Sequence, residues 1–170
     1  MEAKLQPPRV LLECNGFDPY TPELHWMKRE AEDWLNAASP RWLSLLGSSG
    51  VGKTMIASAL AKQRNATFRK WTWVLDLLRQ REWGVKDFLI RRPVLVIDDL
   101  GSAHETPFAQ AFMEELADRR LGSWTVWTSN LLLHQIGEHV SQRVRSRMRR
   151  GGSRVVEIVS TKDWNDKDDQ

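Results

Sequence analysis

A glycine-rich segment of the 170-residue chain has the composition and spacing of a phosphate-binding loop. The short apolar run 42–46 comes directly before it, and a helix is expected to start near Lys53. In such a loop the backbone N–H groups point into a concavity at the helix N-terminus, where the aligned peptide dipoles favour an anion. The residues expected to bind the nucleotide are Gly47, Ser48, Ser49, Gly50, Val51, Gly52, Lys53 and Thr54.

Two side chains of this loop have separate expected roles. Lys53 would reach the β- and γ-phosphates of ATP, and the hydroxyl of Thr54 would ligate Mg²⁺. The alternative interpretation is an ordinary flexible glycine turn. The expected strand before the loop and the helix after it favour the phosphate-binding interpretation.

Polar residues end two further runs that are expected to be strands. Asp98 and Asp99 follow the β-branched run 94–97, and Asn130 follows the run 125–128. We expect Asp98 to hold Mg²⁺ through water, and Asp99 to polarise the attacking water. The amide of Asn130 would orient that water or contact the γ-phosphate, because open α/β sheets bind ligands at this edge. Alternatively, the aspartates merely end a strand or cap a helix, and Asn130 is a turn residue.

An arginine-rich segment near the C-terminus is expected to form a helix with two basic flanks. Arg143 and Arg147 are four residues apart on one flank, and Arg145 and Arg149 form a second such pair about 200° around the helix. One pair could reach the phosphate of a neighbouring subunit, and the other could meet solvent or nucleic acid. Spacing alone favours a solvated basic face.

Nine tryptophans are many for a chain of this length. Trp71, Trp73 and Trp83 lie among arginines and lysines, a mixture that suits stacking on single-stranded bases. Core packing is the favoured interpretation for these three side chains.

The elements that must position these residues alternate between strand and helix. Thr21-Pro22 has the residues of an N-cap followed by proline at the first helical position, and that helix is expected to reach about Ala38. The other expected elements are strands at 42–46, 67–71, 94–97, 125–128 and 154–159, and helices from Lys53, over 73–91 with a break at Gly84, after Thr106-Pro107 and over 138–150. This alternation predicts an α/β fold with a parallel sheet.

Composition narrows the class of protein. The length suits one domain. The net charge is +3, and the positive charge is concentrated in the arginine segment. The single cysteine, Cys14, excludes an intramolecular disulfide framework. No stretch has the roughly 18 apolar residues that a membrane span needs, so no membrane partner and a cytoplasmic location are expected. We divide the chain into a short N-terminal segment (1–20), a core (21–160) and an acidic tail (161–170).

Taken in order, these motifs resemble the DnaC/IstB group of AAA+ ATPases, bacterial helicase loaders and transposition helper ATPases. The matching segments are Gly16 to Pro22, the loop 47–54, Val96 to Gly101, Thr128-Ser129-Asn130 and Arg143 to Met148. The resemblance implies that Asn130 is the sensor 1 residue, Arg147 the arginine finger and Arg143 its companion. It also implies a five-stranded P-loop sheet in the order 5-1-4-3-2.

The sequence departs from this group at both ends. Only about twenty residues precede the core, where a typical loader has a helicase-docking domain, and about ten follow the fifth expected strand. We therefore expect no helical C-terminal lid. Arg147 of a second copy is expected to complete the nucleotide site through self-association.

The favoured function is an ATPase that loads a replicative helicase on single-stranded DNA. The alternatives are an IstB-like helper of a transposase, a small-molecule P-loop kinase, and a binding module in which ATP is only a structural switch. The shorter side chain of Asp99 compared with glutamate keeps slow or vestigial hydrolysis open.

Overall fold

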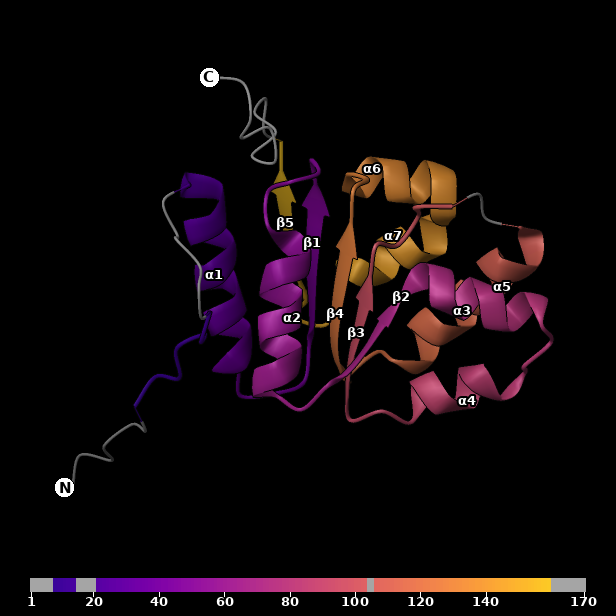
Figure 1. Cartoon of the computed structure of the whole chain (residues 1–170), viewed down its shortest axis with the longest axis horizontal. Coiled ribbons are helices and arrows are strands. Elements are labelled where there is room, and N and C mark those ends of the chain that lie inside the picture. Colours follow the sequence, from indigo (N-terminus) through magenta and orange to yellow (C-terminus); the bar gives the residue numbers. More distant parts are fainter. Residues whose placement is uncertain (1–7, 15–20, 104–105, 160–170) are drawn as a thin grey trace, which may run out of the picture.

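The sheet at the centre of the molecule has five parallel strands (Figure 1). The computed structural model describes residues 8–14, 21–103 and 106–159. The strands are β1 (Trp42–Gly47), β2 (Thr67–Lys70), β3 (Val94–Asp98), β4 (Trp124–Ser129) and β5 (Arg154–Ile158). Their order is β2-β3-β4-β1-β5, and every neighbouring pair is parallel. The expected order 5-1-4-3-2 is confirmed, since it is the same order read from the opposite edge.

Helices cover both faces of this sheet. On one face lie α1 (Pro22–Leu35) and α2 (Lys53–Gln63). On the other lie α3 (Trp71–Arg79), α4 (Gly84–Ile90), α5 (Pro107–Arg119), α6 (Leu133–Gln135), the π-helical turn η1 (Ile136–Val140) and α7 (Gln142–Met148). All six residues of β1 are buried, as expected for a central parallel strand that is covered on both sides.

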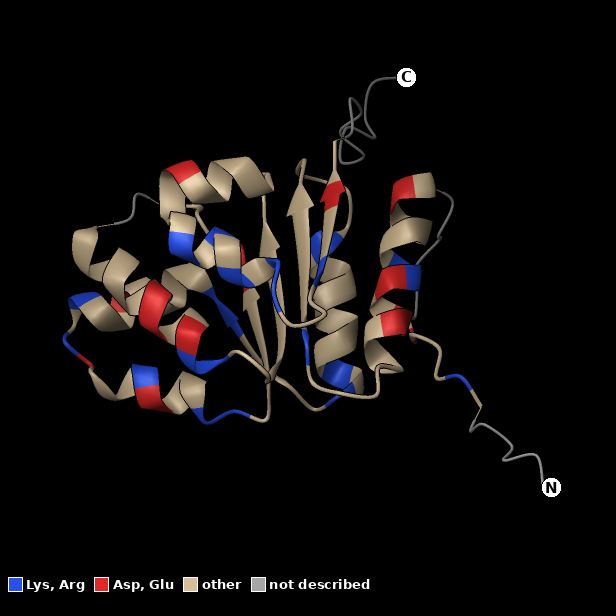
Figure 2. Cartoon of the chain, turned by 180° about the vertical axis from the view of Figure 1, so that it is seen from behind, with Lys and Arg blue, Asp and Glu red and all other residues tan. Residues whose placement is uncertain are grey.

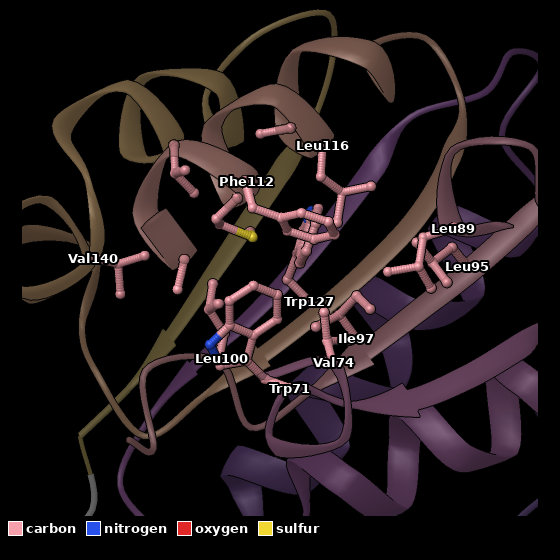
Figure 3. Packing of buried hydrophobic residues seen from close by; sticks show 14 of the residues in the cluster. Trp71, Val74, Leu89, Leu95, Ile97, Leu100, Phe112, Leu116, Trp127 and Val140 are labelled. Atoms are coloured by element: carbon pink, nitrogen blue, oxygen red, sulfur yellow. The ribbon is translucent and has the colours of Figure 1, made fainter. Parts of the chain in front are cut away.

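The two layers of core follow from the alternation of side chains along the strands. In β1, Leu43 and Leu45 face α1 and α2, whereas Trp42 and Leu46 face the other layer. Figure 3 shows that second layer, in which Phe112 of α5 and Trp127 of β4 belong to one cluster with Trp71, whose ring centroid lies 6.4 Å from that of Phe112. The rings of Trp42 and Trp127 meet edge to face, with 5.2 Å between their centroids. This packing fixes β1 and β4, the two strands whose ends carry the loop 47–54 and Asn130.

The cap-and-proline signals predicted the starts of two helices correctly. The hydroxyl of Thr21 accepts from Leu24 N–H at 3.2 Å, and that of Thr106 accepts from Ala109 N–H at 3.1 Å. In each case a proline occupies the first turn, where its missing N–H leaves no hydrogen bond unmade.

Several expected boundaries were wrong, and one expected break is confirmed. β2 ends at Lys70, because Trp71 is already the first residue of α3, where its side chain is fully buried. The expected break at Gly84 is confirmed, since the helical stretch is two helices and Gly84 begins the second of them. The helix expected over 138–150 is broken at Ser141, whose hydroxyl accepts from Arg143 N–H and caps α7. The residues before Ser141 form the π-helical turn η1 instead.

The chain ends lie mostly outside the described residues. This holds for the acidic tail 161–170 and for residues 16–20 of the motif that resembles the loaders. Residues 8–14 are described, and Leu12 is buried against α1 and α2. Within the described part of the chain, only Val159 follows β5, and no helix is long and apolar enough to cross a membrane.

Candidate functional site

The residues expected to do chemistry meet at the carboxyl edge of the sheet. A cavity of about 530 Å³ lies there, at the ends of β1, β3 and β4. It is lined by Ser49, Gly50, Gly52, Lys53, Thr54, Met55, Lys70, Asp98, Asp99, Thr128 and Asn130. The cavity therefore joins the glycine-rich loop to both aspartates and to Asn130, which are far apart in the sequence.

Three residues of the loop face away from this cavity. Gly47 lies inside β1, where a Cβ would come within 1.9 Å of the carbonyl oxygen of Ile158. The N–H of Ser48 donates to that same carbonyl at 2.9 Å, and Val51 is buried in the core. Close contact with β5 thus explains the first glycine of the loop, and the residues that line the cavity start at Ser49.

Lys53 begins α2 and is bound to its own loop. Its Nζ donates to the carbonyl oxygens of Gly47 at 2.8 Å and Ser48 at 2.5 Å. Burial lowers the pKa of Lys53 to about 8, although the nearby charges of Asp99 and Asp98 oppose that shift. The cation is therefore enclosed by backbone oxygens and carboxylates at the N-terminus of a helix, a place that favours anions.

Asp98 is held by two hydroxyls. Its Oδ1 accepts from Thr54 Oγ1 at 2.9 Å and from Thr128 Oγ1 at 2.6 Å, and the residue is 2% exposed. The Thr128 hydroxyl also accepts from Asp99 N–H at 2.9 Å. Thr128 thus links the side chain of one aspartate to the backbone of the next. The sequence placed Thr128 at the end of the expected strand 125–128, next to Ser129 and Asn130, but did not single it out.

Asp99 has an unusual backbone conformation. Its φ of 62° lies in the left-handed region, which non-glycine residues rarely adopt and which occurs often at functional sites. The next residue, Leu100, donates its N–H to Thr128 O at 2.9 Å and so holds this turn against β4. Asn130 Nδ2 lies 3.5 Å from Asp99 Oδ1, which brings the expected sensor residue beside the expected catalytic carboxylate.

The donor set is suited to Mg²⁺ bound together with phosphate. Among the described residues, no group of three or more His, Cys, Asp or Glu side chains could hold a metal ion unaided. Mg²⁺ in nucleotide sites uses one or two protein oxygens, the phosphates and water. Thr54 and Asp98 have their oxygens 2.9 Å apart and fit that requirement.

Lys70 is a residue of the cavity that the sequence did not single out. It ends β2, directly opposite Asp98 in the parallel register of β2 and β3. Only the pairing of these strands places it beside the aspartates, since about 30 residues separate them in the chain.

The arginines of α7 occupy two flanks, as expected from their spacing. Arg143 Nη2 lies 2.5 Å and Arg147 Nε 2.6 Å from the carboxylate of Asp118, in the last turn of α5. The hydrogen bond from Arg147, with the charges of both arginines, lowers the pKa of Asp118. Neither arginine lines the cavity described above.

The opposite flank of α7 borders a basic groove. Arg145 and Arg149 line it together with Arg154 of β5 and Trp26 of α1, and its volume is about 560 Å³. Arg154 is fixed there by two hydrogen bonds to the buried carboxylate of Glu30. Figure 2 shows the basic segments of α7 and the loop after it near the middle of the molecule.

The three tryptophans set among basic residues have different environments. Trp71 is fully buried, as the favoured interpretation expected. Trp73 is 36% exposed and packs against Phe88 and Arg69. Trp83 is 57% exposed, and its ring meets that of Phe108 edge to face at 5.4 Å. The last pair is an exposed aromatic surface.

Comparisons with known proteins agree on the fold. No family model and no curated protein matches the sequence. Among solved structures, DnaI is 23% identical with a TM-score of 0.70 and covers 83% of this chain and 87% of its own. The DnaC helicase loader is 18% identical with a TM-score of 0.71, covering 86% and 96%. The replication initiator DnaA bound to AMPPCP and single-stranded DNA is 20% identical with a TM-score of 0.61, covering 79% and 44%.

The fold of the chain is therefore that of an AAA+ P-loop domain. The resemblance that the motifs indicated is confirmed at the level of the fold, since DnaI and the DnaC helicase loader are among the structural neighbours.

Proposed function

We propose that the protein binds and hydrolyses ATP and acts as a replicative helicase loader on single-stranded DNA. One observation supports the proposed binding and hydrolysis of ATP. A single cavity combines the glycine-rich loop with Asp98 held by Thr54 and Thr128, and with Asp99 beside Asn130. A loop alone would support phosphate binding, whereas the added carboxylates and amide support hydrolysis.

The residues of the cavity have distinct roles in this proposal. The N–H groups at the start of α2 receive the phosphates, and Lys53 turns from its own loop carbonyls toward the β- and γ-phosphates. Thr54 and Asp98 hold Mg²⁺, which neutralises charge that develops on the phosphates. Asp99 and Asn130 orient the attacking water at the γ-phosphate.

A second copy would contribute the arginine finger. Arg147 places only its Nε on Asp118, and a guanidinium has further donors on its two terminal nitrogens. Those donors remain for the γ-phosphate of a neighbour, with Arg143 as companion on the same carboxylate. Asp118 then orients both side chains, because it is the anchor that they share.

Single-stranded DNA is the proposed nucleic acid partner. The exposed Trp83–Phe108 pair suits stacking of bases. The groove with Arg145, Arg149 and Arg154 suits a phosphate backbone. The likeness to the DnaC helicase loader, and to a DnaA structure that holds AMPPCP and single-stranded DNA, supports a role in replication and hence in the cytoplasm.

The test measures phosphate release from ATP with and without single-stranded DNA. We expect slow turnover that DNA stimulates, and loss of turnover in Asp99→Asn. Arg147→Ala should abolish the stimulation and leave ATP affinity nearly unchanged; an equal fall in ATP binding would refute the role in trans. Arg91→Ala removes an exposed arginine that lines neither the nucleotide cavity nor the basic groove, and it is the control for stimulated turnover.

The same assay separates the alternatives. Phosphate release without any small-molecule acceptor contradicts a kinase. Turnover in Asp99→Asn that is no lower than in the wild type would show that ATP acts only as a structural switch.

A further inference from the structure

Lys70 stands where two strands bring a cation next to the aspartates of the nucleotide cavity. Its Cα is paired with that of Asp98 across β2 and β3. Parallel strands lie about 4.8 Å apart, and residues paired in register point to the same face of the sheet. Lys70 and Asp98 both line the cavity, as this register requires.

The positive charge of the Lys70 side chain is not paired with a carboxylate among the described residues. The side chain is exposed, and in the described part of the chain it takes part in no hydrogen bond or ion pair. Its neighbour Arg69 differs, since that guanidinium stacks on the rings of Trp73 and Phe88, 4.8 and 5.5 Å from their centroids. The lysine ammonium is thus available to a ligand of the cavity.

With a triphosphate bound, the cavity would hold more negative charge than Mg²⁺ and Lys53 together neutralise. ATP carries more negative charge than one Mg²⁺ removes, and Asp98 and Asp99 add two carboxylates. Lys53 gives one compensating positive charge from the side of β1. Lys70 gives another from the opposite side, because β3 and β4 separate β2 from β1 in the sheet.

The position also indicates which phosphate Lys70 meets. The loop after β1 receives the inner phosphates, so the phosphate chain runs from β1 toward the carboxyl ends of β3 and β4. The terminal phosphate then lies beside Asp98 and Asp99. Lys70 is on the far side of these aspartates from the loop, and it is therefore close to the γ-phosphate and distant from the α-phosphate.

We propose that Lys70 binds the γ-phosphate from within the same subunit and makes the site discriminate nucleoside triphosphate from diphosphate. This inference rests on the proposed nucleotide site. It adds a cation that acts in cis, independently of the arginine that a second copy would supply.

The experiment measures the affinity of the full chain for Mg²⁺-AMPPCP and for Mg²⁺-ADP by calorimetric titration. In Lys70→Gln we expect the affinity for AMPPCP to fall about tenfold, the effect of one charge-assisted hydrogen bond, and that for ADP to change by less than about twofold. Lys70→Arg should restore most of the AMPPCP affinity. Lys62→Ala removes an exposed lysine of α2 outside this cavity and should change neither affinity.

The controls separate this inference from the proposed function. Lys53→Ala should weaken binding of both nucleotides, and thermal melts of all variants check that they are folded. If Lys53→Ala has that effect while Lys70→Gln changes both affinities equally or neither, Lys70 does not bind the γ-phosphate and the site itself stands. If the wild-type protein binds neither nucleotide, the nucleotide site and the role of Lys70 are both wrong.

Discussion

Replacing Thr128 by valine tests whether its hydroxyl organises the two aspartates. Valine has nearly the same shape, but it removes the 2.6 Å hydrogen bond to Asp98 and the acceptor of Asp99 N–H. Thr128 itself is 1% exposed, so water has little access to its side chain. Thr128→Val therefore leaves the partly buried N–H of Asp99 without its partner and weakens the support of the buried Asp98 carboxylate.

The size of the effect follows from these two contacts. A hydrogen bond to a charged group contributes about 1.5–3 kcal/mol, and a stranded buried donor costs about 1–3 kcal/mol. Because the contacts share one hydroxyl and valine is the more apolar, we expect a total loss of about 2–4 kcal/mol in the free energy of unfolding. For a chain of this size, that loss lowers the Tm by roughly 5–15 °C.

Hydrolysis should fall as well, because the hydrogen bond from Asp99 N–H to the Thr128 hydroxyl helps to hold the turn in which Asp99 has its left-handed φ of 62°. We expect ATP turnover to drop about tenfold or more, since small displacements of catalytic groups are costly. Urea unfolding without nucleotide and phosphate release with ATP measure the two effects.

Thr128→Ser is the matched control, as it keeps the hydroxyl and loses only a methyl group. It should cost about 1 kcal/mol and retain most of the turnover. If the valine variant is as stable as the serine variant and turns over ATP equally well, the hydroxyl does not hold the site together.

Three further changes probe the structure around the site. Arg120→Met should lower the free energy of unfolding by about 2–4 kcal/mol in a urea titration. The buried guanidinium of Arg120 donates to four backbone carbonyls and one threonine hydroxyl, and all five acceptors would lose this partner. The control is Arg119→Met, which changes the adjacent, exposed arginine and should have little effect. The folded-state pKa of Lys53, about 8, lies below its unfolded value, so the nucleotide-free protein should gain about 1–2 kcal/mol, after allowance for screening, as the pH rises from about 8 to 10. Lys53→Met should lack that gain, and an equal gain in both proteins would contradict the assignment. Gly47→Ala should lower the free energy of unfolding by about 3 kcal/mol or more, because its Cβ would meet a β5 carbonyl oxygen at 1.9 Å. Gly122→Ala, where φ is also positive but the space around the Cβ is open, should lower it by about 1 kcal/mol, and thermal melts compare the two.

Much of the fold and of the nucleotide site could be predicted from local patterns. The glycine-rich loop between strand and helix, Asp98 after its apolar run, and the proline after Thr106 each depend on neighbours within a few residues. Such signals need no knowledge of the tertiary structure. They correctly predicted five parallel strands and the edge of the sheet at which the site residues meet.

The residues that the sequence did not reveal depend on distant contacts. Lys70 is one of many lysines until β2 pairs with β3 and sets it opposite Asp98. Arg120 reads as an exposed charge at a helix end, yet it is completely buried and bonds the carbonyls of segments about 30 residues away. Gly47 fits the phosphate-loop pattern, but its close contact with β5 requires the fifth strand to be in place.

The arrangement of charges gives the nucleotide cavity and the arginine pair separate anchors. Lys53 and the aspartates belong to the carboxyl edge of the sheet, whereas Arg143 and Arg147 are tied to Asp118 in the last turn of α5. Either arginine would have to break its charge-assisted bond to Asp118 before it could turn toward the cavity of its own subunit. Among the described residues, the cations that line the nucleotide cavity are Lys53 and Lys70. If Arg147 acts as the proposed finger, we therefore expect it to act on the phosphate of a second copy, with Asp118 holding its side chain.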